Sequence, residues 1–291
     1  MDAQIVDLRP GMSFAGRFAC ARKDRLRSRN GSPYLALELR DRTGALPARV
    51  FRDADRAAAR FERGDPVRAR GKVELFRGEL QAELAVIEGL GEGEWEPGEF
   101  LPVAYRSTDE LEGFFEHLLR EVHDPGLRAV VEKVTSAPSV AAELKRAPCT
   151  RSGHHAYLGG LIEHTVSVGT LALELCQLHP RLDSDLVMAA VLLHDIGKTR
   201  EFTYGAEIGI SDEGRLLGHL AIGADIIGPA ARELPDARRL ALLNCVLSHH
   251  GPDRSGSRAA GPTRGFDSAE AQAVYRLNAL DASVKSSLEG G

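Results

Sequence analysis

The chain has 291 residues, of which 43% are hydrophobic and 27% are charged, a composition typical of an ordinary globular protein with room for two domains. Its longest apolar run, LVMAAVLL, is too short to cross a bilayer, and the start MDAQIVDLRPG has neither region of an export signal. We therefore expect a cytoplasmic protein with no membrane partner. The four cysteines lack C-x-x-C spacing and favour reduced, packed thiols: Cys20, Cys149, Cys176 and Cys245.

Charge is divided unevenly along the chain, although the net value is only −5. Residues 1–90 hold 18 Lys and Arg against 13 Asp and Glu, a net of +5, and the remaining residues hold 19 against 29, a net of −10. A basic first part favours polyanionic partners such as phosphate chains, and an acidic second part favours cations.

The first 90 residues have the pattern of short strands. PYLALELRD (33–41) alternates apolar and polar residues, as a half-buried strand does. RTGALPARVFRD and DPVRARGKVELFRGELQAELAVIEGL add further strands broken by Gly and Pro, with one brief helix near RDADRAAARFERG. About five short strands in one compact segment predict a small β-barrel. The acidic stretch GEGEWEPGEF begins a predicted linker over 91–105.

Residues 106–291 have a helical period and predict an all-α bundle. DELEGFFEHLLREVHD repeats apolar residues at three- and four-residue spacing. GLIEHTVSVGTLALELCQLH, DSDLVMAAVLLHDIGK, RRLALLNCVLSHHG and DSAEAQAVYRLNALDASVK continue the pattern, and Asp183 or Ser184 is a candidate cap of the third of these five helices. GPDRSGSRAAGPTRG (251–265) is expected to be a mobile loop.

Two adjacent pairs of polar residues end apolar helices in this bundle: His194–Asp195 in LLHDIGK and His249–His250 in LSHHG. A lone buried histidine is more often a hydrogen-bonded core residue, but paired ligands at helix ends favour a metal site. Adjacent helical residues point about 100° apart, so one carboxylate could bridge two ions while its neighbour binds one. Imidazole and carboxylate suit Mn²⁺, Fe²⁺, Zn²⁺, Co²⁺ and Ni²⁺.

These motifs resemble the HD superfamily of metal-dependent phosphohydrolases. More closely, SGHHAYLGGLIEHT, LLHDIGKTREF, DEGRLLGHL and LSHHG are similar to the YhaM-type 3′→5′ exoribonucleases, and RLRSRNGSPYLALELRDRTGALPARVF resembles that family's OB-fold. The resemblance implies an all-β OB-fold barrel over 1–90 and an all-α HD domain over 106–291. It implies two divalent ions, Mn²⁺ first among them, with one held by His164, His194 and Asp195 and the other by Asp195, His219, His249 and His250.

One departure from the family concerns the first ion. The family's segment resembles ADNLDA, whereas this chain has LNALDA, so Asn278 stands where the family has an aspartate. A neutral amide oxygen would replace a carboxylate there. Asp281, three residues on and on roughly the same helix face, is the candidate to substitute for it. Both are therefore candidate metal ligands.

Three further residues are candidates for contact with the substrate. Lys198 resembles the lysine of HDIGK motifs and is expected to reach a phosphate oxygen, with a solvated helix-end cation as the alternative. Arg215 could hold a second phosphate or lie on the surface, and Tyr157 could stack on a base. His154 and His155, in the same HHAY segment, could bind metal or serve as structural caps.

The barrel carries a concentrated run of basic residues. On an OB-fold this segment covers a strand end and the following loop, near the groove that binds single strands. The alternative is a solvated basic loop. The candidate nucleic-acid-binding residues in the barrel are Arg22, Lys23, Arg25, Arg27, Arg29 and the aromatic Tyr34.

Together these observations predict a metal-dependent 3′→5′ exoribonuclease. The barrel would hold single-stranded RNA, with single-stranded DNA as a second candidate substrate, and Asp195 and Lys198 would act at a two-ion site that activates water. A homo-oligomer is compatible with this prediction. Two alternatives stay open: an HD-type nucleotide phosphodiesterase, and an RNA-binding or regulatory protein whose metal site is degraded.

Overall fold

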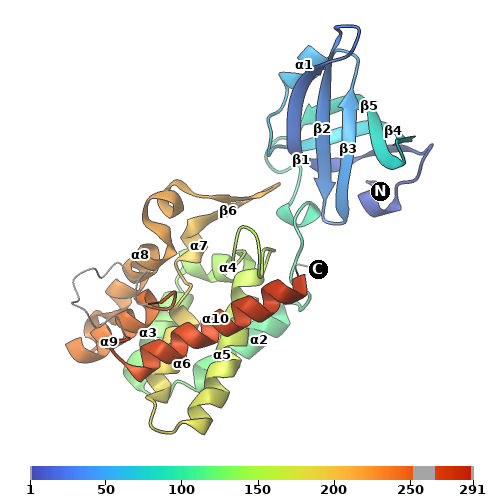
Figure 1. The fold of residues 1–291 in the computed structure, drawn as a ribbon. Helices are drawn as coiled ribbons and strands as arrows, with labels where there is room; N and C mark the ends of the chain where they lie inside the picture. Colours follow the sequence, from blue (N-terminus) through green and yellow to red (C-terminus); the bar gives the residue numbers. More distant parts are fainter. Residues whose placement is uncertain (1, 252–265, 290–291) are drawn as a thin grey trace. The chain divides into compact units, whose positions relative to one another are not determined.

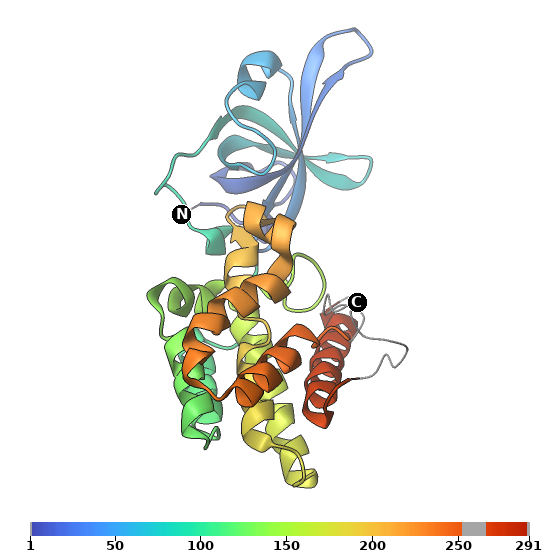
Figure 2. The same cartoon turned by 90° about the vertical axis from the view of Figure 1, so that its left-hand side faces the viewer.

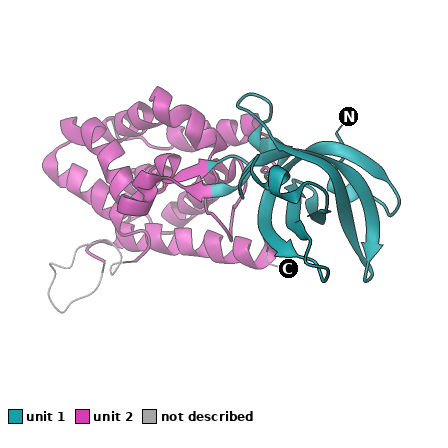
Figure 3. Cartoon of the chain, turned by 90° about the horizontal axis from the view of Figure 1, so that it is seen from above, with its two compact units in different colours: residues 1–102, 204–208 teal, residues 103–203, 209–291 magenta. Residues whose placement is uncertain are grey.

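The computed structural model describes residues 2–251 and 266–289. The chain divides into two compact units, residues 1–102 with 204–208 and residues 103–203 with 209–291 (Figure 3). The stretch expected to link two domains, 91–105, is thus shared between the units. The expected loop 251–265 lies outside the described residues, apart from Gly251.

The first unit is a five-stranded closed barrel (Figure 1). Around the barrel the strand order is β1-β2-β3-β5-β4, in which β3 pairs with β5 in parallel and the other neighbours are antiparallel. This arrangement confirms the predicted OB-fold. The elements are η1 (Ile5–Asp7), β1 (Ser13–Arg27), β2 (Pro33–Asp41), β3 (Gly44–Val50), α1 (Ala54–Ala58), β4 (Pro66–Phe76), β5 (Glu79–Gly89) and η2 (Pro97–Glu99).

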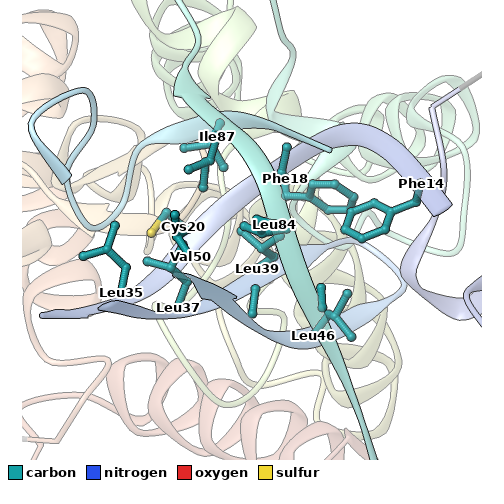
Figure 4. Packing of buried hydrophobic residues seen from close by; sticks show 14 of the residues in the cluster. Phe14, Phe18, Cys20, Leu35, Leu37, Leu39, Leu46, Val50, Leu84 and Ile87 are labelled. Carbon is teal, nitrogen blue, oxygen red and sulfur yellow. The ribbon is translucent and has the colours of Figure 1, made fainter. Parts of the chain in front are cut away.

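Alternate residues of the strands fill the barrel. The predicted inward residues of β2, Leu35, Leu37 and Leu39, are at most 2% exposed and pack with Phe18 (Figure 4). Gly71, where β4 shifts register, lets the strands approach closely, because a side chain there would begin 2.3 Å from the carbonyl oxygen of Glu83. The interior is therefore a packed core, which leaves the outer surface of the barrel for binding.

The second unit is a helical bundle around α6 (Figures 1 and 2). Every residue of α6 from Leu186 to Leu193 is buried, as expected of a helix that is apolar on all sides, and α2, α3, α5, α9 and α10 contact it. Asp183 caps α6 as predicted, since its Oδ1 accepts a hydrogen bond from the Leu186 N–H at 3.0 Å. The all-α prediction is confirmed, with one small two-stranded sheet added between α7 and α8.

Among the described residues, no helix is both long and apolar enough to cross a membrane.

The helices and short strands that follow Pro102 make up the rest of the described chain. The elements are α2 (Thr108–Arg120), α3 (Pro125–Thr135), α4 (Pro138–Arg146), α5 (Gly160–Leu178), α6 (Ser184–Leu193), α7 (Lys198–Glu201), β6 (Phe202–Tyr204), β7 (Ile208–Ile210), α8 (Asp212–Ala230), η3 (Ala231–Glu233), α9 (Asp236–Leu247) and α10 (Ala269–Glu289).

Candidate metal centre and nucleic-acid surface

The HDIGK segment is a tight turn between α6 and α7. The buried helix α6 ends at Leu193, so that His194 and Asp195 emerge inside the bundle. A side chain at Gly197 would begin 2.0 Å from the carbonyl oxygen of His219, so only glycine allows α8 to approach this turn. Glycine at this position therefore brings the histidine of α8 next to the aspartate of the turn.

A first group of ligand atoms gathers where α5, α6 and α10 meet. The Nε2 atom of His164 lies 3.2 Å from Nε2 of His194 and 3.6 Å from Oδ2 of Asp195. The oxygen of the Asn278 amide lies 3.0 Å from the same His164 nitrogen. His194 donates its Nδ1–H to the carbonyl of Val191 at 2.7 Å, which leaves the Nε2 lone pair for an ion.

A second group gathers around the other oxygen of Asp195. Its Oδ1 lies 3.3 Å from Nε2 of His249 and 3.7 Å from Nε2 of His219, which in turn is 2.9 Å from Nε2 of His250. Ligand atoms of these four residues lie within 4.8 Å of one another. One carboxylate therefore faces both groups of side chains.

The atoms in this cluster fit a divalent ion. Asp195 Oδ1 and His249 Nε2 are buried and have no hydrogen-bond partner in the described part of the chain. Because His249 donates its Nδ1–H to the Val246 carbonyl at 2.6 Å, its Nε2 presents a lone pair, as the carboxylate does. Two lone pairs facing each other in a buried site are unfavourable unless a cation binds both.

Burial sets the protonation of the histidines. It lowers the pKa of His164 and of His249 to about 4 and that of His250 to about 2, so these side chains are neutral at pH 7. Burial opposes ionisation of Asp195, but the ammonium of Lys198 holds the pKa of the carboxyl well below its usual range. Neutral imidazoles beside an ionised carboxylate are the protonation states that a metal requires.

Asn278 and Asp281 contact opposite nitrogens of His164. Asn278 lies at Nε2, facing the first group, and its amide donates to the His249 carbonyl at 3.1 Å. Asp281 accepts from Nδ1 at 2.6 Å and lies 3.0 Å from Nε2 of His155. Asn278 thus holds the position next to the first group, while Asp281 holds the position of a carboxylate that orients a histidine ligand.

The three residues expected to contact the substrate differ in burial and in their partners: Lys198, Tyr157 and Arg215. Lys198 is 5% exposed and donates to Asp195 Oδ2 at 2.7 Å, so the solvated alternative does not hold. The hydroxyl of Tyr157 donates to Glu163, which ties the ring into the bundle. Arg215 lies on the surface, 65% exposed, and pairs with Asp212 at 3.3 Å.

Glu201 supports the centre although no sequence prediction names it, whereas His155 was a candidate metal ligand or cap. Glu201 accepts from the backbone and from Nδ1 of His219, both at 3.1 Å, and thereby directs Nε2 of His219 toward Asp195. His155, buried and at a φ of +52°, lies between Glu163 and Asp281. Glu201 lies three residues after Lys198, within the segment LLHDIGKTREF.

A cavity of about 370 Å³ lies on the barrel between strands β1 to β3 and the β4–β5 turn, and its wall holds three arginines and two glutamates, Glu38 and Glu79. Its wall includes Arg22, Arg49, Arg77 and Phe76, and the guanidinium of Arg77 lies over the Phe76 ring at 5.4 Å. Phe76 is 55% exposed, so a base could stack there. Of these four residues, Arg22 belongs to the basic run predicted from the sequence to bind nucleic acid.

The basic run covers the end of β1 and the loop that follows it, and its side chains differ in whether they pair within the protein. Lys23 is 13% exposed, donates to the Ala58 carbonyl at 2.8 Å and pairs with Glu62, so its ammonium holds the α1 region rather than facing solvent. Arg29 is exposed and has no ion pair within the described ranges. Three others are exposed but paired: Arg22 with Asp24, Arg25 with Asp55 and Arg27 with the Gly31 carbonyl. The ring of Tyr34 packs against that of Phe51, with 5.6 Å between the ring centroids.

Comparison with known protein families identifies one domain in the barrel and one in the helical unit. Residues 161–283 match the HD domain family, and residues 18–88 match the OB-fold nucleic acid binding domain family. Among solved structures, the second OB-fold domain of replication protein A from Methanococcus maripaludis covers 33% of this chain and 100% of that chain, with 18% identity and a TM-score of 0.27.

Similarity to characterised relatives extends over most of the chain. The 3′-5′ exoribonuclease YhaM of Bacillus velezensis is 31% identical over 258 residues, which cover 88% of this chain and 80% of the relative. The Bacillus subtilis protein of the same name is 30% identical over the same shares. With the barrel, the HD turn and the histidine cluster in place, this chain belongs to the YhaM family of 3′-5′ exoribonucleases.

Proposed function

We propose that this chain is a metal-dependent 3′→5′ exoribonuclease that digests single-stranded RNA, with single-stranded DNA as a second substrate, at a site for two divalent ions. The observation that carries the proposal is the pair of buried lone pairs on Asp195 and His249, 3.3 Å apart. Mn²⁺ is the first candidate ion, because imidazole and carboxylate ligands both accept it. Family membership supports the direction of digestion.

Within the centre, each residue has a separate task. Asp195 presents one oxygen to each group, and its negative charge is supported by Lys198 at 2.7 Å. The carbonyls of Val191 and Val246 fix the rings of His194 and His249 with Nε2 inward. When bound, divalent ions would supply the Lewis acidity that activates water and neutralises charge on the scissile phosphate.

Asn278 keeps an oxygen in the first group while removing a charge. Its amide oxygen points at His164 Nε2, and its amide nitrogen is satisfied by the His249 carbonyl. The site thus keeps its number of ligand atoms, which supports an active enzyme over a degraded one. We assign to Asp281 the orientation of His164 through Nδ1.

The barrel supplies the sequence-independent hold on the strand. Arg22, Arg49 and Arg77 offer positive charge along the cavity wall, and Phe76 offers a stacking surface. Such a surface binds the backbone and the base faces without reading base edges. Affinity for RNA should therefore depend strongly on salt.

A time course on a 5′-labelled single-stranded RNA tests the proposal. A ladder of shortening products that needs Mn²⁺, stops with EDTA and is absent in Asp195→Ala would support it. A circular RNA of the same sequence should stay intact, because it has no 3′ end. Binding of the linear RNA without any shortening in Mn²⁺, Co²⁺ or Mg²⁺ would instead support the RNA-binding alternative.

A further inference from the structure

A buried thiol borders the first group of metal ligands. Cys149, in the loop after α4, is fully buried, and its Sγ lies 3.7 Å from Asp195 Oδ2 and 3.4 Å from the ammonium of Lys198. The sulfur, the ammonium and the carboxylate thus contact one another, which places the thiol directly beside the metal centre. The sequence gives no sign of this contact, since Cys149 lies far along the chain from the HDIGK turn.

Two imidazoles complete a set of ligands around the sulfur. One ligand atom each from Cys149, His154 and His164 lie within 4.8 Å of one another. The Nδ1 atom of His154 is buried and has no hydrogen-bond partner among the residues that the structure describes. A thiol with two imidazoles is a softer set than the histidines and carboxylate of the neighbouring groups, and such a set favours Zn²⁺.

His164 cannot serve this set and the first group together. Its Nδ1–H is donated to Asp281 at 2.6 Å, so the ring has a single lone pair, on Nε2. That nitrogen also lies 3.2 Å from Nε2 of His194 in the first group. One lone pair binds one ion, so occupancy of either position excludes the other.

We propose that Cys149, His154 and His164 form an alternative site for a soft divalent ion, Zn²⁺ by class, which competes with the ion of the first group. The Cys149 thiol releases its proton to solvent as the sulfur–metal bond forms. Residues 151–153, in the loop that joins Cys149 to His154, are exposed. If the proposed exonuclease activity is correct, zinc bound here withdraws His164 from the first group and inhibits digestion.

Cobalt absorption tests the site without RNA or turnover. Co²⁺ is added stepwise to the full chain, and the near-ultraviolet band of sulfur-to-cobalt charge transfer is recorded. We expect the band in the wild type and in the matched control Cys176→Ser, whose cysteine lies in α5, and its loss in Cys149→Ser. A wild type that binds cobalt without this band, or that binds no cobalt, would overturn the proposal, as would a band that persists in Cys149→Ser.

A second measurement uses the unaltered chain, so it holds even if a variant fails to fold. Zinc X-ray absorption of the wild type should show a sulfur neighbour at about 2.3 Å. Only nitrogen and oxygen neighbours would contradict the site. Neither spectrum depends on RNA, so failure here would leave the exonuclease proposal standing.

The functional consequence is measured separately. Zinc inhibition of Mn²⁺-supported digestion is measured relative to each protein's own rate with Mn²⁺. In Cys149→Ser this inhibition should weaken by at least about 10-fold, because loss of even an outer partner of a metal site changes metal affinity by about that much. Cys176→Ser should be inhibited like the wild type. Equal inhibition of Cys149→Ser and the control would remove the competitive role.

Discussion

Asp195 Oδ1 and His249 Nε2 face each other at 3.3 Å with a lone pair on each atom, and neither has a hydrogen-bond partner among the described residues. The two residues come from different segments, the turn after α6 and the turn after α9. A fold that brings two such acceptors together in a buried site is less stable without a cation than with one. Metal binding and folding should therefore be coupled.

This coupling predicts that Mn²⁺ stabilises the folded helical unit. An ion that binds only the folded state adds about 2.7 kcal/mol of stability at 100 times its dissociation constant, so the melting temperature should rise with Mn²⁺ and fall with EDTA. Differential scanning calorimetry measures the shift. Asp195→Ala should show little of it, and an equal shift in this variant would mean that Mn²⁺ binds elsewhere.

Asn278→Asp should raise metal affinity while weakening the metal-free protein. The new carboxylate adds a charge next to His164 Nε2, but it replaces the amide that donates to the His249 carbonyl, a loss of about 1–3 kcal/mol for a buried acceptor. Calorimetric titration with Mn²⁺ and urea unfolding in EDTA measure the two effects. Asn30→Asp, which adds the same charge on an exposed loop of the barrel, is the control. Unchanged Mn²⁺ affinity in Asn278→Asp would place this residue outside the metal centre.

Asp281→Asn should lower metal affinity without removing a ligand. The carboxylate holds Nδ1 of His164 at 2.6 Å, and loss of such an outer partner reduces affinity by roughly 10–100-fold. Mn²⁺ titration followed by calorimetry measures the change. The control is Asp225→Asn, whose carboxylate is 73% exposed and pairs with Arg200. If both variants bind Mn²⁺ equally well, Asp281 does not orient the histidine.

Lys198→Met should destabilise the metal-free protein strongly. Methionine matches the lysine stem but leaves the Asp195 carboxylate, 1% exposed, without its ammonium partner, and removing one partner of a buried pair costs about 3–5 kcal/mol. Urea unfolding in EDTA should show this loss, and Mn²⁺ should restore part of it. Lys145→Met provides the contrast, since its surface pair with Glu112 contributes about 1 kcal/mol or less. A loss as small as that of the control would mean that the Asp195 charge is balanced in another way.

The sequence predicts most of the fold because its patterns are local. Alternation in PYLALELRD marks the inward residues of β2, and the apolar run of α6 marks a buried helix. The adjacent pairs His194–Asp195 and His249–His250 mark the ends of helices that meet. In each case a single segment carries the information, so neighbouring residues suffice for the prediction.

The remaining features depend on contacts between distant segments. Asn278 and Asp281 share a helix face in the sequence pattern, yet they reach opposite nitrogens of one ring because of how α10 packs on α5. Lys23 belongs to a basic run, but the α1 region turns it inward. Cys149 has no partner within its own segment that would mark it as part of a site. Such relationships follow from tertiary packing, which no local pattern contains.

Arg49 and Arg77 should contribute to RNA binding through charge. Both line the cavity on the barrel, so replacing either with glutamine should weaken binding of single-stranded RNA regardless of its sequence. Each lost phosphate contact should also reduce the slope of log affinity against log salt by about 0.7, the value for single strands. Fluorescence anisotropy with Asp195→Ala as the common background, in EDTA, prevents digestion during the measurement. Arg239→Gln, which removes a surface arginine paired with Asp236 in the helical unit, should leave both affinity and slope unchanged. If the three arginine variants behave alike, the RNA does not follow this cavity, and the exposed Arg29 becomes the next position to test.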